Sequence, residues 1–251
     1  MALPTSPSNS VRPRGSPGVS PSQPAIRLAV GIVVLWGALT GLGILLVDAW
    51  TPSSLTDWDA RVSHWFFTHR TPTLTMLSRW GSFLAETTTC IAVTAVAMLV
   101  LRWWLGRWRE SMVVLVAIVG ELVIFLAVTN VVHRHRPSVP RLDPSVLTST
   151  SSFPSGHTGA AVALYCCLGI LVLRNLHRRW FAVTVAALLF ALPVIVGVSR
   201  VYRGMHYLTD VIAAAVAMAC WLALVLTVLL PRHHAEPAAA EAADPAVLAA
   251  P

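Results

Sequence analysis

The chain has 251 residues, of which 56% are apolar and only 12% are charged, and its formal net charge is +7. A charged fraction this low excludes an ordinary soluble domain. The basic residues are all arginines and lie in short turns between apolar stretches, so no continuous basic face is available for nucleic-acid binding.

Six apolar stretches are long enough, or nearly so, to cross a bilayer as helices, which takes about 20 residues each. They are residues 26–47, 83–101, 112–132, 159–173, 180–198 and 211–230. The fourth is short and needs flanking residues to span. The sequence therefore predicts an all-α, polytopic membrane bundle of six transmembrane helices over residues 26–230. Residues 1–25 and 231–251 are rich in Pro, Ser or Ala and predict disordered tails.

Residues 51–82, between the first two spans, mix tryptophans such as Trp58, Trp65 and Trp80 with polar residues. Tryptophan is enriched where a membrane meets water. We expect this segment to lie along one membrane face and to anchor the protein there.

Two carboxylates fall in or near the predicted spans, Glu121 in the third and Glu86 near the outer end of the second. An intramembrane carboxylate is costly and is kept for a reason. We expect Glu121 to make a polar contact between helices and Glu86 to cap its helix.

The turns at residues 102–110 and 174–180 each contain three arginines and lie on the same side as both tails. The excess of arginine in cytoplasmic loops makes that side cytoplasmic, with both termini inside the cell and the opposite side extracytoplasmic. The opposite side carries eight arginines. The assignment therefore depends on setting aside those that belong to the motifs described next.

Four polar motifs lie at the ends of the predicted spans, and alternation of the spans brings all four to the extracytoplasmic face. Arg136 follows the third span, residues 155–157 open the fourth, Arg200 ends the fifth, and residues 206–210 open the sixth. Charged groups at such positions are usually functional. We therefore predict an active site on this face.

The residue types in these motifs are those needed for phosphoryl transfer. His206 and Asp210 are four residues apart, so on a helix they would share one face, and the carboxylate could orient the imidazole as a nucleophile. Ser155 and Gly156 begin a span, where a hydroxyl and backbone N–H groups can bind an anion. His157 is then placed to protonate a leaving oxygen.

Arg136 and Arg200 carry planar guanidinium groups that can bind phosphate oxygens in pairs. Together the motifs resemble those of the type 2 phosphatidic acid phosphatase family, which shares its site with vanadium-dependent haloperoxidases. The third motif of that family is matched by Ser199, Arg200, His206 and Asp210, the second by residues 154–157, and the first by Arg136 and Pro137. The first motif also expects a lysine, where this chain has Thr129.

The resemblance implies that His206 forms a phosphohistidine, that Asp210 supports it and that His157 protonates the leaving group. The residues implied to hold the phosphate oxygens are Arg136, Arg200, Ser155, Gly156 and Ser199. We expect Arg134 to replace the charge of the missing lysine, with Asn130 and His133 as further contributors. The constellation implies no cofactor and no metal.

The expected substrate is a lipid phosphate or diphosphate drawn from the bilayer of the cell membrane. Undecaprenyl diphosphate is preferred because the site is predicted to face outward and because an arginine-only composition is typical of a GC-rich bacterium. Phosphatidylglycerophosphate and phosphatidic acid remain open. So do transfer of the phosphate to another alcohol and a non-catalytic protein that only binds lipid phosphate.

Overall fold

The computed structural model describes residues 22–49, 53–143 and 151–230 and contains no strand within those ranges. The helices are α1 (Ser22–Ile44), α2 (Ser54–Thr68), α3 (Pro72–Phe83), α4 (Thr87–Leu105), α5 (Arg109–Thr129), α6 (Gly156–Ala161), α7 (Cys167–Asn175), α8 (Arg179–Tyr202) and α9 (Leu208–Leu229), with π-helical turns η1 (Leu45–Ala49) and η2 (Val162–Cys166). Helix α1 begins inside the predicted N-terminal tail. The rest of that tail and residues 231–251 lie outside the described residues.

Six helical spans in the described residues are long and apolar enough to cross a membrane, and this confirms the predicted all-α, six-span architecture. The fourth span runs over Gly156–Asn175 because α6, η2 and α7 form one continuous helix that takes in residues on both sides of the predicted stretch. Large apolar side chains on the outer faces remain exposed, as with Trp103 at 87% and Trp180 at 70%. Such surfaces suit contact with lipid.

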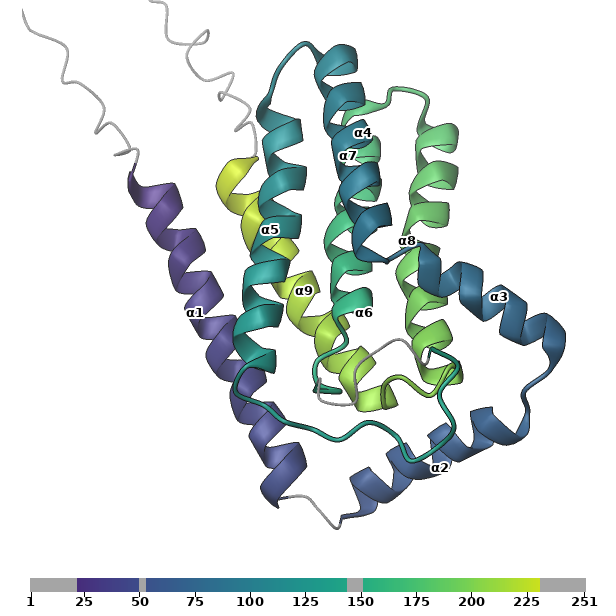
Figure 1. Ribbon diagram of the computed structural model, residues 1–251. Coiled ribbons are helices and arrows are strands. Elements are labelled where there is room, and N and C mark those ends of the chain that lie inside the picture. Colours follow the sequence, from purple (N-terminus) through teal and green to yellow (C-terminus); the bar gives the residue numbers. More distant parts are fainter. Residues whose placement is uncertain (1–21, 50–52, 144–150, 231–251) are drawn as a thin grey trace, which may run out of the picture.

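The spans alternate in direction, so the loops gather at two opposite ends of the bundle (Figure 1). One end holds the start of α1, the α4–α5 and α7–α8 turns and the end of α9. The other end holds α2 and the loops that follow α5 and α8. All the polar motifs therefore come to one end, as predicted, while the side of the membrane that this end faces stays a prediction.

Helices α2 and α3 fill the segment predicted to lie along the membrane face. Each begins at a hydroxyl side chain that accepts a hydrogen bond from the first turn, Ser53 from the N–H of Thr56 and Thr71 from that of Leu74. Such caps satisfy backbone donors that the helix leaves free. Glu86 occupies the cap position of α4, as expected, but its side chain makes no capping hydrogen bond.

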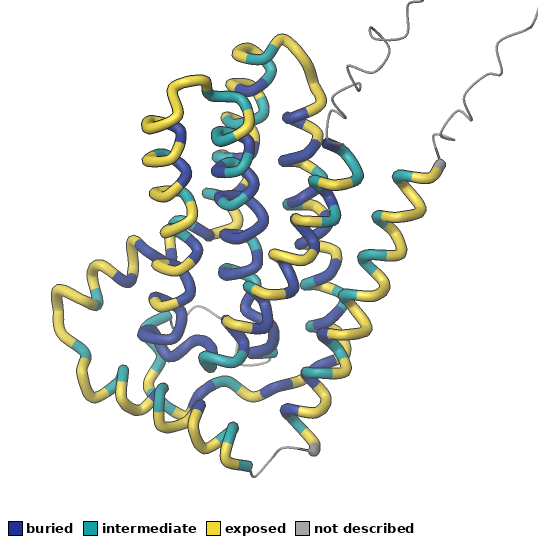
Figure 2. Tube along the Cα trace, turned by 180° about the vertical axis from the view of Figure 1, so that it is seen from behind, coloured by how far each residue is buried: buried dark blue, intermediate teal, exposed yellow. Residues whose placement is uncertain are grey.

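The centre of the bundle is built where α5 and α9 meet around Trp221, which is 1% exposed. Its indole N–H donates to the carbonyl of Ala117 at 3.0 Å. Gly120 makes room for the ring, because a Cβ there would lie 2.0 Å from Trp221 Cζ2. Figure 2 shows buried residues along the inner helices and around the loops at the end that carries the motifs. This packing gives the motifs a rigid support.

Candidate active site

A polar cavity of about 480 Å³ opens among the loops at the end of the bundle that carries the motifs. Four of the residues predicted for the site line it together, namely His157, His206, Arg136 and Arg200, and Gly156 joins them. They come from the α5–α6 loop, the start of α6, the end of α8 and the α8–α9 turn. Separate stretches of sequence thus surround one small volume.

His206 lies in the turn between α8 and α9, not on a helix. Gly204 permits this turn because its φ of +70° falls in the left-handed region that favours glycine. The imidazole Nδ1 lies 2.6 Å from the carbonyl oxygen of Ser152 but 3.9 Å from Asp210 Oδ2. The predicted helical pairing of His206 with Asp210 is therefore wrong in its geometry, because α9 begins after the histidine.

The contact with Ser152 determines which nitrogen of the His206 ring carries the hydrogen. A carbonyl oxygen can only accept, so Nδ1 carries the hydrogen and Nε2 keeps its lone pair. Burial lowers the pKa of His206 well below its ordinary value, and the positive charges of Arg200 and Arg136 lower it further. The imidazole is therefore neutral at neutral pH, which is the form that a nucleophile requires.

Asp210 is fully buried and supports this arrangement through Ser152. Its Oδ2 accepts a hydrogen bond from the Ser152 hydroxyl at 2.5 Å and another from the backbone N–H of Tyr207 at 2.9 Å. Ser152 thus holds the carboxylate with its side chain and the histidine with its carbonyl. Nothing in the sequence singled out Ser152, which lies in a run of serines and threonines.

Arg134 does not lie in the cavity, contrary to the prediction that it replaces the missing lysine. Its guanidinium forms ion pairs with Asp210 and, at 2.9 Å, with Asp59 of α2, and it stacks 4.4 Å from the centre of the Tyr207 ring. Burial opposes its charge, but the two carboxylates raise its pKa. Two buried anions hold it more strongly than a solvated cavity would.

Arg136 and Arg200 are the two arginines that do line the cavity. Arg136 donates to the carbonyl of Met205 at 2.6 Å and to that of Ser151 at 3.3 Å. Arg200 donates from Nη1 to Ser82 Oγ at 2.7 Å, while its buried Nε has no hydrogen-bond partner among the described residues. Arg136 and Arg200 thus bring to the cavity wall two guanidinium groups of the kind that binds phosphate oxygens.

Two predicted phosphate-binding hydroxyls lie outside the cavity lining. Ser199 donates to the carbonyl of Ile195 at 2.7 Å and packs against Gly81 of α3, where a Cβ would lie 2.2 Å from its Oγ. Ser155 shares a hydrogen bond of 3.0 Å with Thr158. In these positions Ser199 packs in the contact between α3 and α8, and the Ser155 hydroxyl bonds within the first turn of α6.

Asp143 and Arg203 are polar residues of this region that sequence reasoning missed. The carboxylate of Asp143 pairs with Arg203 and lies 3.2 Å from Nη1 of Arg200. Burial acts to raise the pKa of Asp143, but the two arginines lower it overall. Asp143 therefore holds Arg200 against the bundle.

Thr129 lines the cavity at the end of α5, where the family motif has a lysine, and its hydroxyl donates to the carbonyl of Phe125 at 3.0 Å. Asn130 and His133, the other candidates for the missing contact, line it too. We predict that Thr129→Lys lowers KM for a lipid phosphate by about tenfold, because a charged donor would then reach the anion. Steady-state kinetics test this, with Thr129→Met as the uncharged control. Equal KM values for the two variants would contradict it.

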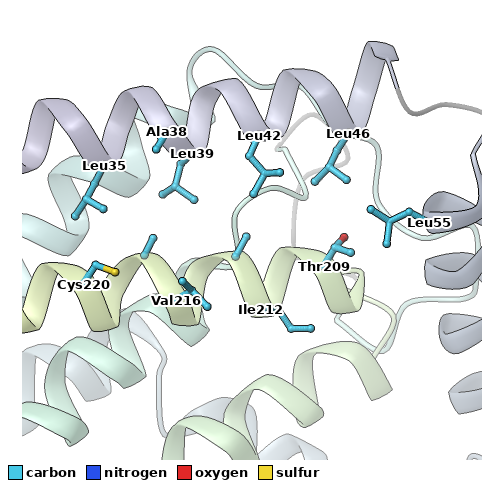
Figure 3. A pocket seen from close by; sticks show the side chains of 12 residues that line it. Leu35, Ala38, Leu39, Leu42, Leu46, Leu55, Thr209, Ile212, Val216 and Cys220 are labelled. Carbon is cyan, nitrogen blue, oxygen red and sulfur yellow. The ribbon is translucent and has the colours of Figure 1, made fainter.

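A separate cavity of about 460 Å³ lies between α1 and α9 (Figure 3). Its lining is almost wholly aliphatic, with residues such as Leu39, Leu42 and Val216, and it contains no histidine or arginine. It offers no group able to act on a phosphate, so the polar cavity remains the candidate site.

Comparison with known proteins agrees with the motifs. The model of the PAP2 superfamily matches residues 110–233. Phosphatidylglycerophosphatase B of Bacillus subtilis (strain 168) is 33% identical over 78 residues, which cover 29% of this chain and 36% of that protein. The match thus spans little more than a third of the curated relative.

A similar fold occurs in the crystal structure of the first transmembrane PAP2 type phosphatidylglycerolphosphate phosphatase from Bacillus subtilis. The TM-score is 0.64 at 21% identity, over 81% of this chain and 94% of that one. The family model covers the segment that carries all the motifs, and the solved structure repeats the arrangement of the helices. The segment 110–233, which holds all the motifs, belongs to the PAP2 superfamily.

Proposed function

We propose that the protein is a membrane phosphatase that hydrolyses the phosphomonoester of a glycerophospholipid, with phosphatidylglycerophosphate as the first candidate. One observation carries the proposal, namely that two histidines and two arginines line a single polar cavity at the end of an apolar helical bundle. A bound phosphate there would meet a nucleophile, an acid and two cations, while its lipid chains stay at the level of the spans.

The reaction follows from these roles. Nε2 of His206 attacks the phosphorus in line, and the bond from phosphorus to the lipid oxygen breaks as His157 gives that oxygen a proton. Water then attacks the phosphorus of the phosphohistidine and returns a proton to His157. The bond between phosphorus and Nε2 breaks, so phosphate leaves and His206 is restored. Arg136 and Arg200 stabilise the charge on the phosphoryl oxygens. Asp210 steadies the imidazolium through Ser152.

The choice of substrate changes from the one that the sequence favoured. The relatives found are described as phosphatidylglycerophosphatases, so phosphatidylglycerophosphate comes before undecaprenyl diphosphate. Phosphatidic acid shares the glycerophospholipid phosphomonoester and stays beside it. Outward placement of the site and arginine-only composition do not distinguish between these lipids.

The test is phosphate release by the purified protein in detergent, without an added alcohol, from phosphatidylglycerophosphate, phosphatidic acid and undecaprenyl diphosphate. We expect release from the two glycerophospholipids with kcat/KM at least about tenfold above that for the diphosphate, a ratio set by roughly one well-placed interaction. Release that requires an added alcohol would indicate phosphotransfer instead. A higher kcat/KM for the diphosphate would overturn the substrate assignment.

A further inference from the structure

A groove of about 580 Å³ adjoins the polar cavity between α4, α5 and the start of α6. The two share Phe125, Gly156 and His157 in their linings. Beyond these residues the groove is lined mainly by aliphatic side chains such as Ile91, Leu115 and Ile118. It is therefore an apolar extension of the candidate active site along the membrane-spanning part of the bundle.

Two buried polar side chains interrupt this apolar lining. Thr94 of α4 is 7% exposed, and its hydroxyl has no hydrogen-bond partner among the described residues. Glu121 of α5 is 5% exposed, and its carboxyl group forms no hydrogen bond or ion pair with the described residues. Polar groups buried without partners are uncommon and call for an explanation.

Glu121 does not make the polar helix contact that the sequence predicts. Its Oε1 lies against α6 at Gly159, where a Cβ would be 2.7 Å away, and no hydrogen bond forms there. No cation from the described part of the chain pairs with it, and an ionised carboxylate would be uncompensated in this lining. A neutral carboxylic acid can instead donate a hydrogen bond, as the hydroxyl of Thr94 can. The groove thus holds two potential donors.

The depth of these donors matches one part of phosphatidic acid. Glu121 is one turn before Phe125 on α5, or about 6 Å along the helix axis, and it touches α6 two residues after His157, or about 3 Å. In phosphatidic acid the ester carbonyls follow the phosphate by only the glycerol carbons, a span comparable to one helical turn of about 5.4 Å. In phosphatidylglycerophosphate a phosphodiester and a second glycerol intervene, and a polyprenyl diphosphate has no ester carbonyl.

We propose that Glu121 and Thr94 recognise the ester carbonyls of phosphatidic acid when its phosphate occupies the polar cavity, and so determine specificity for this diacyl substrate. The inference rests on the proposed function and selects phosphatidic acid from its two glycerophospholipids. Ester carbonyls accept hydrogen bonds from both side chains, whereas a hydrocarbon chain leaves both unpaired. An unpaired buried donor opposes binding of the wrong chain more strongly than an extra contact favours the right one.

The test compares a diacylglycerol phosphate with the dialkyl ether analogue of equal chain length, which lacks both carbonyls. We expect the wild-type protein to favour the diacyl lipid by about tenfold in kcat/KM, the effect of roughly one well-placed hydrogen bond. Equal values for the two lipids would overturn the inference while leaving the proposed function standing. Failure to release phosphate from any lipid would overturn both.

Variants assign the preference to these residues. Glu121→Leu combined with Thr94→Val is expected to bring the ratio close to one through loss of rate on the diacyl lipid alone. Glu121→Gln, which keeps a hydrogen-bond donor, is expected to retain most of the preference. Thr184→Val, on the exposed surface of α8, is the matched control. A preference for the diacyl lipid that survives the double substitution would reject the assignment to these residues. If the double variant fails to fold, the comparison of the two lipids with the wild-type protein still tests the inference.

Discussion

Replacing His206 with alanine is expected to lower phosphate release by about 10³-fold or more, because the group that we propose attacks phosphorus is lost and no described residue stands in its place. Lipid phosphate should still bind, since Arg136 and Arg200 remain in the cavity. Phosphate release and equilibrium binding of a lipid phosphate, measured on the same preparation, separate the two effects.

The exposed His177, in the turn at the opposite end of the bundle, provides the control, and His177→Ala should keep full activity. A second measurement follows the intermediate directly. Labelled phosphate should remain on the protein after an alkaline quench and be lost in acid, as expected for a phosphohistidine, and His206→Ala should retain none. Normal turnover in His206→Ala would reject the nucleophile, and binding without turnover in the wild-type protein would favour a non-catalytic lipid-phosphate binder.

Arg134→Met is expected to destabilise the fold by about 3–5 kcal/mol, because it leaves Asp59 and Asp210 as buried carboxylates without a counter-charge. A loss of this size should lower the midpoint of thermal unfolding in detergent by about 10 °C. Had Arg134 faced the cavity as a phosphate ligand, the same substitution would lower activity and leave stability nearly unchanged.

Arg61→Met is the matched control, since Arg61 is exposed on α2 near Asp59 and forms no ion pair with the residues that the structure describes. Its expected cost is below about 0.5 kcal/mol. Adding Asp59→Asn to Arg134→Met removes one of the two uncompensated charges and should restore part of the stability. An unchanged midpoint in Arg134→Met would show that the ion pairs contribute nothing to the fold.

The six spans and the meeting of the motifs could be predicted because both depend on local properties of the sequence. Apolar length identifies a span, and alternation of spans carries Arg136, His157, Arg200 and His206 to one end without any knowledge of packing. Gly156 was predicted to present its backbone N–H to an anion, and it lines the cavity. Its close approach to Phe125, where a Cβ would lie 2.8 Å from the ring, was not predicted.

The partners of these residues could not be predicted, because side-chain pairing across the bundle leaves no mark in local sequence. Asp59 and Arg134 are separated by 75 residues, and no local pattern indicates that they pair. Arg134 stood in the motif region and so was assigned to phosphate, although two carboxylates hold it elsewhere. Ser199 was assigned to phosphate on the same grounds, and its motif position does not reveal that its side chain packs against Gly81 of α3.

Helix α2 matters for more than the contact with the membrane that its tryptophans predict. Asp59, on its buried side, fixes the guanidinium that neutralises the aspartate below the reactive ring. Without these ion pairs α2 would only lie along the membrane face. Through them it is connected to the candidate active site. Displacing α2 would unbalance the charges next to the His206 imidazole before any residue that lines the polar cavity had moved.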